Sequence, residues 1–116
     1  MSLRAGRASE RGAAVVDFVL VLVLHVRNTL TAAASEGARY AATVDRPPEA
    51  GAARTREQIA GALAARFARD VSAHPASVHG APGVEIDVSA KVPPLGIWGP
   101  AVPLRVAAHA VEEDAP

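Results

Sequence analysis

The chain has 116 residues, enough for a single small domain, and it contains no cysteine, which excludes disulfide bridges and thiolate metal sites. Its 12 basic residues balance 12 acidic ones, so the formal net charge is zero, which argues against a nucleic-acid binder. Apolar residues make up 50% of the chain but aromatic residues only 3%, so any core is built from small side chains. We expect a thin core with little room for an active-site cleft, and therefore no enzyme.

The N-terminal part of the sequence changes abruptly from basic to apolar. Residues 1–12 contain three arginines against one glutamate and predict a flexible basic leader. The arginines are Arg4, Arg7 and Arg11. Residues 13–24 are apolar except for Asp17. A basic segment followed by an apolar one is the order of an export or insertion signal whose arginines stay in the cytoplasm.

The helix-forming character continues past the apolar run, and we predict one helix over residues 13–44. Its second half carries a stripe of small residues at helical spacing: Ala33, Ala34, Gly37, Ala38 and Ala41. Such a stripe can be a seam that packs against other helices in a filament or membrane, or it can arise by chance in an alanine-rich chain. The segment Asp45 to Pro48 then ends the helix, because proline removes a backbone donor.

A short linker, residues 45–54, is predicted to precede a second helix. Thr55 and Gln58 have the spacing of a capping box, which marks a helix start. Apolar side chains then recur every four residues and indicate one buried face: Ile59, Leu63, Phe67 and Val71. We expect this amphipathic helix to end at His74 and Pro75.

The last third of the chain switches to a period of two, which is typical of strands with one buried face. The alternation runs over residues 84–92 and again over 102–111, with a loop rich in proline and glycine at 93–101. Two such strands predict an antiparallel hairpin whose apolar face is covered by the second helix. The predicted fold class is α+β: a long N-terminal helix, a short amphipathic helix and a C-terminal antiparallel β-hairpin, with residues 55–116 as a small domain.

The residues around Gly12 form the most specific pattern in the sequence. Glu10-Arg11-Gly12 is followed by AAVVD, which places a glycine at the basic-to-apolar boundary and Asp17 at the fifth position after it. This pattern resembles the class III leader of type IV pilin-like proteins. Together with the stretch RNTLTAAASEGARYAA, it is similar to TadE-like proteins, the minor pseudopilins of tight-adherence (Flp) pilus systems. The apolar run is shorter than the family's, and the family usually has Glu where this chain has Asp17.

The resemblance implies a function in pilus assembly. A prepilin peptidase would cut after Gly12, on the cytoplasmic side, and the mature chain would begin at Ala13. The freed ammonium group of Ala13, on this or a neighbouring subunit, would pair with Asp17. The implied partners are other pilin or pseudopilin subunits, the inner-membrane assembly platform and the lipid membrane. The implied location is the bacterial cytoplasmic membrane, with the N-terminus inside and the C-terminal domain outside, or the pilus or cell surface.

The apolar run bears on this function in two ways. An acid within it costs several kcal/mol at the centre of a bilayer unless it is paired, so Asp17 calls for a partner. The run itself is short, because the 12 residues from Ala13 to Leu24 reach only about 18 Å as a helix, against a hydrocarbon core of about 30 Å.

Two other classes of protein stay open on the sequence. The basic leader, the apolar run and Ala32-Ala33-Ala34 also fit the outline of a secretory signal peptide, which would release a soluble protein that starts at Ser35. A cytosolic interaction module, with its apolar helix buried in a partner, is the other possibility. The four histidines have no metal-ligand spacing, and no motif frames a catalytic nucleophile, so we predict no metal and no cofactor.

Overall fold

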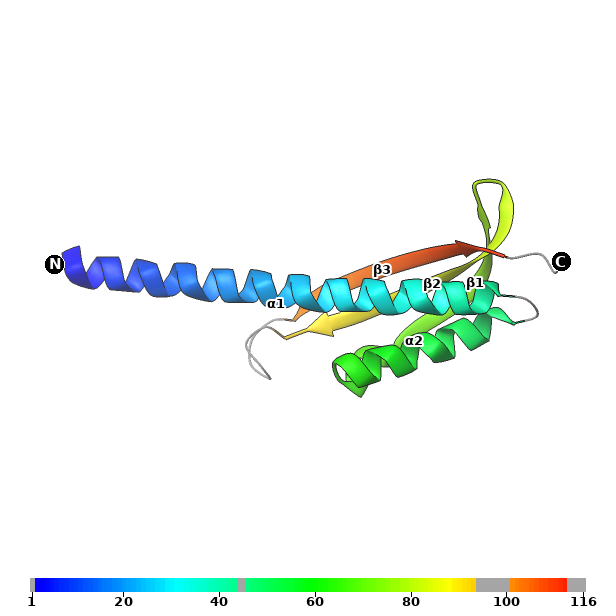
Figure 1. Ribbon diagram of the computed structural model, residues 1–116. Coiled ribbons are helices and arrows are strands. Elements are labelled where there is room, and N and C mark those ends of the chain that lie inside the picture. Colours follow the sequence, from blue (N-terminus) through cyan, green and yellow to red (C-terminus); the bar gives the residue numbers. More distant parts are fainter. Residues whose placement is uncertain (1, 44–45, 94–100, 113–116) are drawn as a thin grey trace.

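The computed structural model describes residues 2–43, 46–93 and 101–112, with side chains described from Ser9 onward. The fold is α+β, as predicted. Its elements in chain order are α1 (Ser2–Ala42), α2 (Pro48–Ala62), the 3-10 helix η1 (Ala65–Ala68), β1 (Asp70–Val78), β2 (Ala81–Val92) and β3 (Val102–Val111). The strands form one antiparallel sheet in the order β1-β2-β3. The molecule is elongated, with extents of 73 × 27 × 18 Å, because the N-terminal half of α1 projects beyond the rest (Figure 1).

The first helix begins earlier than the sequence predicted. α1 starts at Ser2, so the leader that we expected to be flexible is helical and continuous with the apolar run. Leucine, alanine, arginine and glutamate, which make up much of this segment, are good helix formers. Neither proline nor glycine interrupts the sequence between Gly12 and Gly37. α1 ends at Ala42, and Val44, the predicted end, lies outside the described residues.

The second helix also begins earlier than predicted, so most of the expected linker is helical. α2 starts at Pro48, where the fixed φ of proline suits the first helical position and its missing N–H costs nothing. Thr55 therefore lies inside the helix, where its hydroxyl donates to the Gly51 carbonyl at 2.8 Å instead of capping an N-terminus. The helix ends at Ala62, and the N–H of Leu63 closes the last turn on the Ile59 carbonyl at 2.8 Å.

The predicted continuation of this helix to His74 is wrong. Phe67 and Val71 are buried, as expected, but Phe67 lies in η1 and Val71 in β1, a strand that the spacing of four concealed. Within β1 the inward Val71 and Ala73 alternate with polar residues, which is the period of a strand. Pro75 is tolerated there because β1 is an edge strand, where a missing donor breaks no essential ladder bond.

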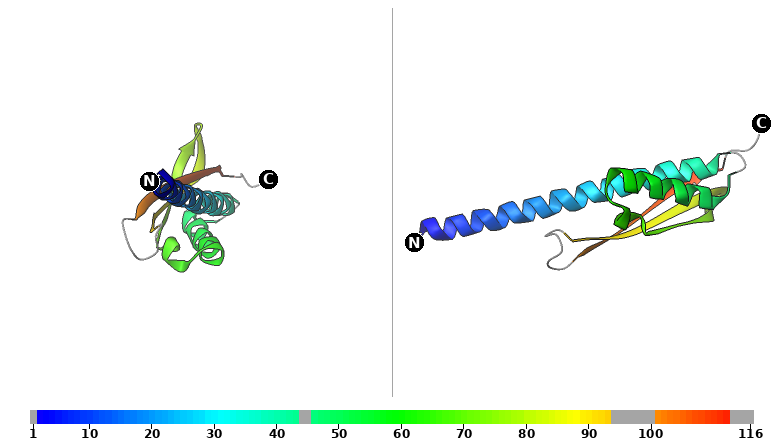
Figure 2. Two further views of the ribbon diagram at one scale, coloured as in Figure 1. Left: turned by 90° about the vertical axis from the view of Figure 1, so that its left-hand side faces the viewer. Right: turned by 90° about the horizontal axis from the view of Figure 1, so that it is seen from below.

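The two faces of the sheet differ in environment. β2 and β3 form the predicted hairpin, in which Val88 pairs with Val106. One face is buried, and its buried side chains are Val71, Val84, Ile86, Val88, Val92, Leu104, Val106 and Ala108. α1 lies over β2 and β3 on this face, while α2 packs beside α1 and against β1 (Figures 1 and 2). The cover that we assigned to the second helix thus comes mainly from α1, and the opposite face of the sheet is open to solvent.

Candidate functional site

The N-terminal half of α1 projects from the domain, and its apolar part, from Ala13 to Leu24, is largely uncovered by the other described residues (Figure 2). Six large apolar side chains on it are between 48% and 67% exposed: Val15, Val16, Phe18, Leu20, Val21 and Leu24. At 3.6 residues per turn these positions are spread around the whole helix rather than along one stripe. A helix that is apolar on every side requires surroundings that are apolar on every side, such as a bilayer or a bundle of helices.

The same helix enters the protein core at the end of the apolar run. Leu22 and Val23 are partly buried, Val26 is 3% exposed, and Leu30 is completely buried against the sheet. The stretch Ser9–Ala42 is long and apolar enough to cross a membrane by length and composition. One side of its second half is occupied in the fold, so the part before about Leu24 is the one that is exposed on most sides.

The predicted processing residues lie on the projecting half of α1. Gly12, Ala13, Asp17 and Arg11 are all exposed, and a Cβ placed on Gly12 would meet nothing within 4 Å. Because Gly12 is inside a continuous helix, a peptidase would have to unwind the helix locally before cutting there. The side chains of the other two leader arginines, Arg4 and Arg7, lie outside the described part of the chain.

The small-residue stripe of α1 is a packing seam, but it packs within this chain. Ala33, Ala34, Gly37, Ala38 and Ala41 are all buried, against α2 and the inner face of the sheet. A Cβ on Gly37 would overlap the hydroxyl of Thr55 and lie 2.6 Å from the carbonyl oxygen of Gly51. The stripe therefore lets α1 and α2 approach closely and leaves no surface there for a second subunit.

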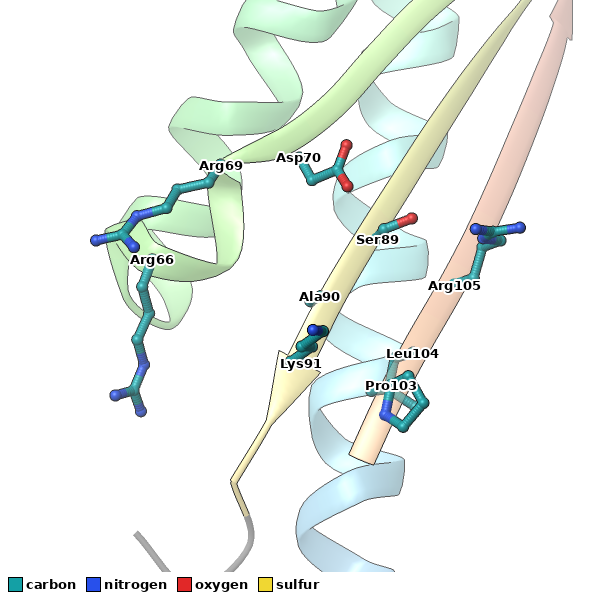
Figure 3. A pocket seen from close by; sticks show the side chains of 9 residues that line it. All are labelled: Arg66, Arg69, Asp70, Ser89, Ala90, Lys91, Pro103, Leu104 and Arg105. Atoms are coloured by element: carbon teal, nitrogen blue, oxygen red, sulfur yellow. The ribbon is translucent and has the colours of Figure 1, made fainter. Parts of the chain in front are cut away.

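A shallow basic pocket of about 650 Å³ lies on the open face of the sheet, where β2 ends and β3 begins (Figure 3). This end of the sheet is the one nearest the projecting half of α1 (Figure 1). Four cationic side chains line it, against the single acid Asp70: Arg66, Arg69, Lys91 and Arg105. The guanidinium groups of Arg66 and Arg69 point away from the strands (Figure 3). The cations therefore do not converge on one ligand, and the pocket is better described as a basic patch.

Farther along the same open face, the structure brings together a histidine-carboxylate cluster that sequence reasoning missed. It consists of His74, Glu85, Asp87 and His109. Glu85 pairs with His74 on one side and with His109 on the other, so the three form a row across β1, β2 and β3. His74 Nε2 lies 2.9 Å from Glu85 Oε2, and His74 Nδ1 lies 3.4 Å from Asp87 Oδ2. His109 Nε2 contacts Glu85 Oε1.

The two carboxyl groups of this cluster perturb each other. Partial burial raises the pKa of Asp87, and the neighbouring Glu85 adds to the rise. The pKa of Glu85 is lowered, first by its hydrogen bond with Asp87 and then by His109, with partial burial acting against them. The cluster escaped the sequence analysis because His74 was assigned to a helix end; the alternation of Val71 and Ala73 with polar residues was the signal that could have placed it on a strand.

No family model, no curated protein and no solved structure matches this chain.

Proposed function

We propose that the chain is a TadE-like minor pseudopilin or assembly factor of a tight-adherence pilus, inserted through the projecting half of α1 and cleaved after Gly12. The observation that carries the proposal is the division of α1 into two halves with different surroundings. Val26 and Leu30 belong to the core of the domain, whereas Phe18 and Leu20, on the same helix, are exposed. A single helix that both holds a small domain together and presents an apolar end is suited to anchoring that domain in a membrane or in a helical bundle.

The length of the projecting half bears on how it is anchored. The apolar part from Ala13 to Leu24 spans about 18 Å, so on its own it would cross only part of a bilayer that is about 30 Å thick. Packing among the helices of other subunits covers an apolar helix whatever its length. We therefore propose that the chain is inserted and processed in the membrane, and that its apolar helix finally packs in a bundle with pilin-type partners.

Two charged features fit this arrangement. Asp17 is the single charged residue from Ala13 to Leu24, and an ammonium group at a cleaved N-terminus would neutralise it. The basic patch lies at the end of the sheet that would face the membrane, where Lys91 and Arg105 could contact anionic headgroups. Neither feature requires catalysis by this chain, which would be a substrate of the prepilin peptidase.

The second candidate function is a secreted soluble protein cut near Ala34. The burial of α1 counts against it, since removal of the first 34 residues would take Val26, Leu30, Ala33 and Ala34 out of the core. Truncation of a single buried leucine typically lowers the free energy of unfolding by about 2–5 kcal/mol. A domain of this size has little stability to spare.

The decisive experiment is intact-mass measurement of the chain co-expressed with a prepilin peptidase. We expect a product that begins at Ala13, and no shortening of the Gly12→Trp variant. Because a Cβ on Gly12 meets nothing within 4 Å and the residue is exposed, this variant should fold normally. Gly61→Trp is the matched control, since Gly61 is equally free of neighbours, and it should be cut as the native chain is.

Each other outcome has a clear meaning. Identical masses with and without the peptidase, in the membrane fraction, would overturn processing after Gly12. A product that begins at Ser35 would replace the proposal with the secretory function. A full-length chain found in the cytosol would point to the interaction module.

A further inference from the structure

The geometry points to a zinc-binding site on the open face of the sheet, with His74, Glu85 and Asp87 as ligands and His109 as the residue that orients Glu85. This inference concerns the histidine-carboxylate cluster and does not rest on the proposed function in pilus assembly. One potential ligand atom from each of the three ligand residues lies within 4.8 Å of the other two. The three residues come from neighbouring positions on two paired strands, so the backbone ladder fixes their spacing.

The ligand atoms of the cluster are close enough for side-chain rotation to bring them around one small ion. Zinc binds nitrogen and oxygen ligands at about 2.0–2.2 Å in a tetrahedron, which sets neighbouring ligand atoms about 3.3 Å apart. His74 Nε2 lies 2.9 Å from Glu85 Oε2, whereas the 3.4 Å contact with Asp87 Oδ2 is made by the other ring nitrogen, Nδ1, and one ion can bind only one of the two nitrogens. One ligand atom of each residue lies within 4.8 Å of the other two, so rotation of the side chains would be enough to gather them around an ion without moving the strands.

The fourth residue supplies the support that metal ligands usually have. His109 Nε2 contacts Oε1 of Glu85, and His74 approaches the other oxygen, Oε2. A hydrogen bond to one carboxylate oxygen holds the group in place and leaves the second oxygen to bind a metal, an arrangement common around metal sites. His109 sits opposite Glu85 in the ladder of β2 and β3, so its position is set by the sheet.

The donor set and the charge favour zinc over the alkaline-earth ions. An imidazole with two carboxylates is a typical set for zinc and its transition-metal neighbours, whereas calcium and magnesium select oxygen ligands alone. Glu85 and Asp87 bring two carboxyl groups, and with them negative charge, to the side of His74. A divalent cation would neutralise that charge. His74 is the most exposed of the ligands, with 48% of its side chain accessible, so an ion could enter directly from solvent.

The test is isothermal titration calorimetry, in which zinc chloride is added to the full chain. The protein is purified in detergent without a histidine tag and is freed of metal with a chelator. We expect one saturable zinc per chain. His74→Ala and Asp87→Asn should each weaken binding by about 100-fold, and His109→Ala by about 10-fold, as loss of an orienting partner does. His25→Ala is the matched control: it removes an exposed histidine from α1, far from the cluster in sequence, and should leave the affinity unchanged.

Folding of each variant is verified by circular dichroism, and Asp87→Asn keeps the shape of the side chain, so a folding defect would be separated from a binding defect. Zinc binding weaker than about 1 mM, or equal affinities for the native chain and His74→Ala, would overturn the site. Calcium and zinc binding with equal affinity would also overturn it, because that result describes an acidic patch without imidazole coordination.

Discussion

Gly37 of α1 and Gly51 of α2 face each other across the contact between the two helices. A Cβ on either residue would lie 2.6 Å from the carbonyl oxygen of the other. Real side-chain carbons do not approach a backbone oxygen so closely, and the backbone cannot move aside as a flexible side chain can. The close approach of the helices, and with it the burial of Thr55 between them, therefore depends on glycine, which has no side chain, at both positions.

The first prediction concerns this pair. Gly37→Ala should lower the free energy of unfolding by about 1–3 kcal/mol, because overpacking outweighs the gain of roughly 0.5–1 kcal/mol that alanine brings to a helix. Urea unfolding of the full chain in detergent measures it. Gly61→Ala, where the added carbon meets nothing, should instead be neutral or slightly stabilising. Equal effects at the two positions would mean that α1 and α2 are not in close contact.

The second prediction tests the division of α1. Leu30 is completely buried and Leu20 is 61% exposed, although both are leucines of the same helix. Leu30→Ala should cost about 2–5 kcal/mol of domain stability, and Leu20→Ala close to none. Leu20→Glu should in turn reduce recovery of the chain in the membrane fraction, while the folded domain keeps its unfolding midpoint. A large loss of stability from Leu20→Ala would show that the projecting half packs on the domain after all.

The third prediction concerns Asp17. Asp17→Asn removes a charge from the apolar run, which should leave membrane insertion intact or improve it. If the carboxylate pairs with a freed N-terminus, the same variant should lose co-purification with pilin-type partners, and Asp17→Glu should retain it. Cleavage after Gly12 is measured in parallel, so a defect in assembly is distinguished from a defect in processing. Normal assembly of Asp17→Asn would argue against the pairing.

The fourth prediction concerns the tie between α2 and the edge strand. Arg56 donates to the Val71 carbonyl at 2.9 Å and approaches Glu49 at 3.2 Å. Arg56→Ala should cost about 1–3 kcal/mol, mainly through the charged hydrogen bond to the backbone, because the exposed ion pair with Glu49 contributes little. Glu49→Gln should accordingly have almost no effect, and Arg69→Ala, on the exposed side of the sheet end, serves as a second control. Thermal unfolding measures all three.

The elements that the sequence predicted well are those with one dominant period. The alternation from Val84 to Val92 and from Val102 to Val111 placed β2 and β3 and their buried face, and the apolar run placed the helix that contains it. Thr55 shows why the second helix was placed too late: a threonine followed three residues later by glutamine resembles a cap, but Pro48 offered an earlier start. β1 was missed because four residues keep the spacing of a helix although the chain changes structure between them. Ile59 lies in α2, Leu63 just after it, Phe67 in η1 and Val71 in β1.

The site shows a similar limit. A stripe of small residues such as Ala33, Gly37 and Ala41 indicates that another element packs closely against the helix. Its spacing is the same whether that element belongs to another chain or is the next helix of the same chain. The histidine-carboxylate cluster depends on strand register, since His74, Glu85 and His109 are distant in sequence and meet only through pairing across the sheet. Histidine spacing along the chain therefore carried no signal of it.

The unbroken course of α1 makes the helix a lever. From Leu24 to Ala42 it extends about 27 Å along the sheet, so a tilt of only 10° in its apolar end would displace the far end of the domain by about 5 Å. α1 is continuous, so it has no break at which such a tilt could be absorbed. The direction in which the open face points, and thus the neighbours that the histidine-carboxylate cluster can meet, is therefore set by whatever binds the apolar end of α1.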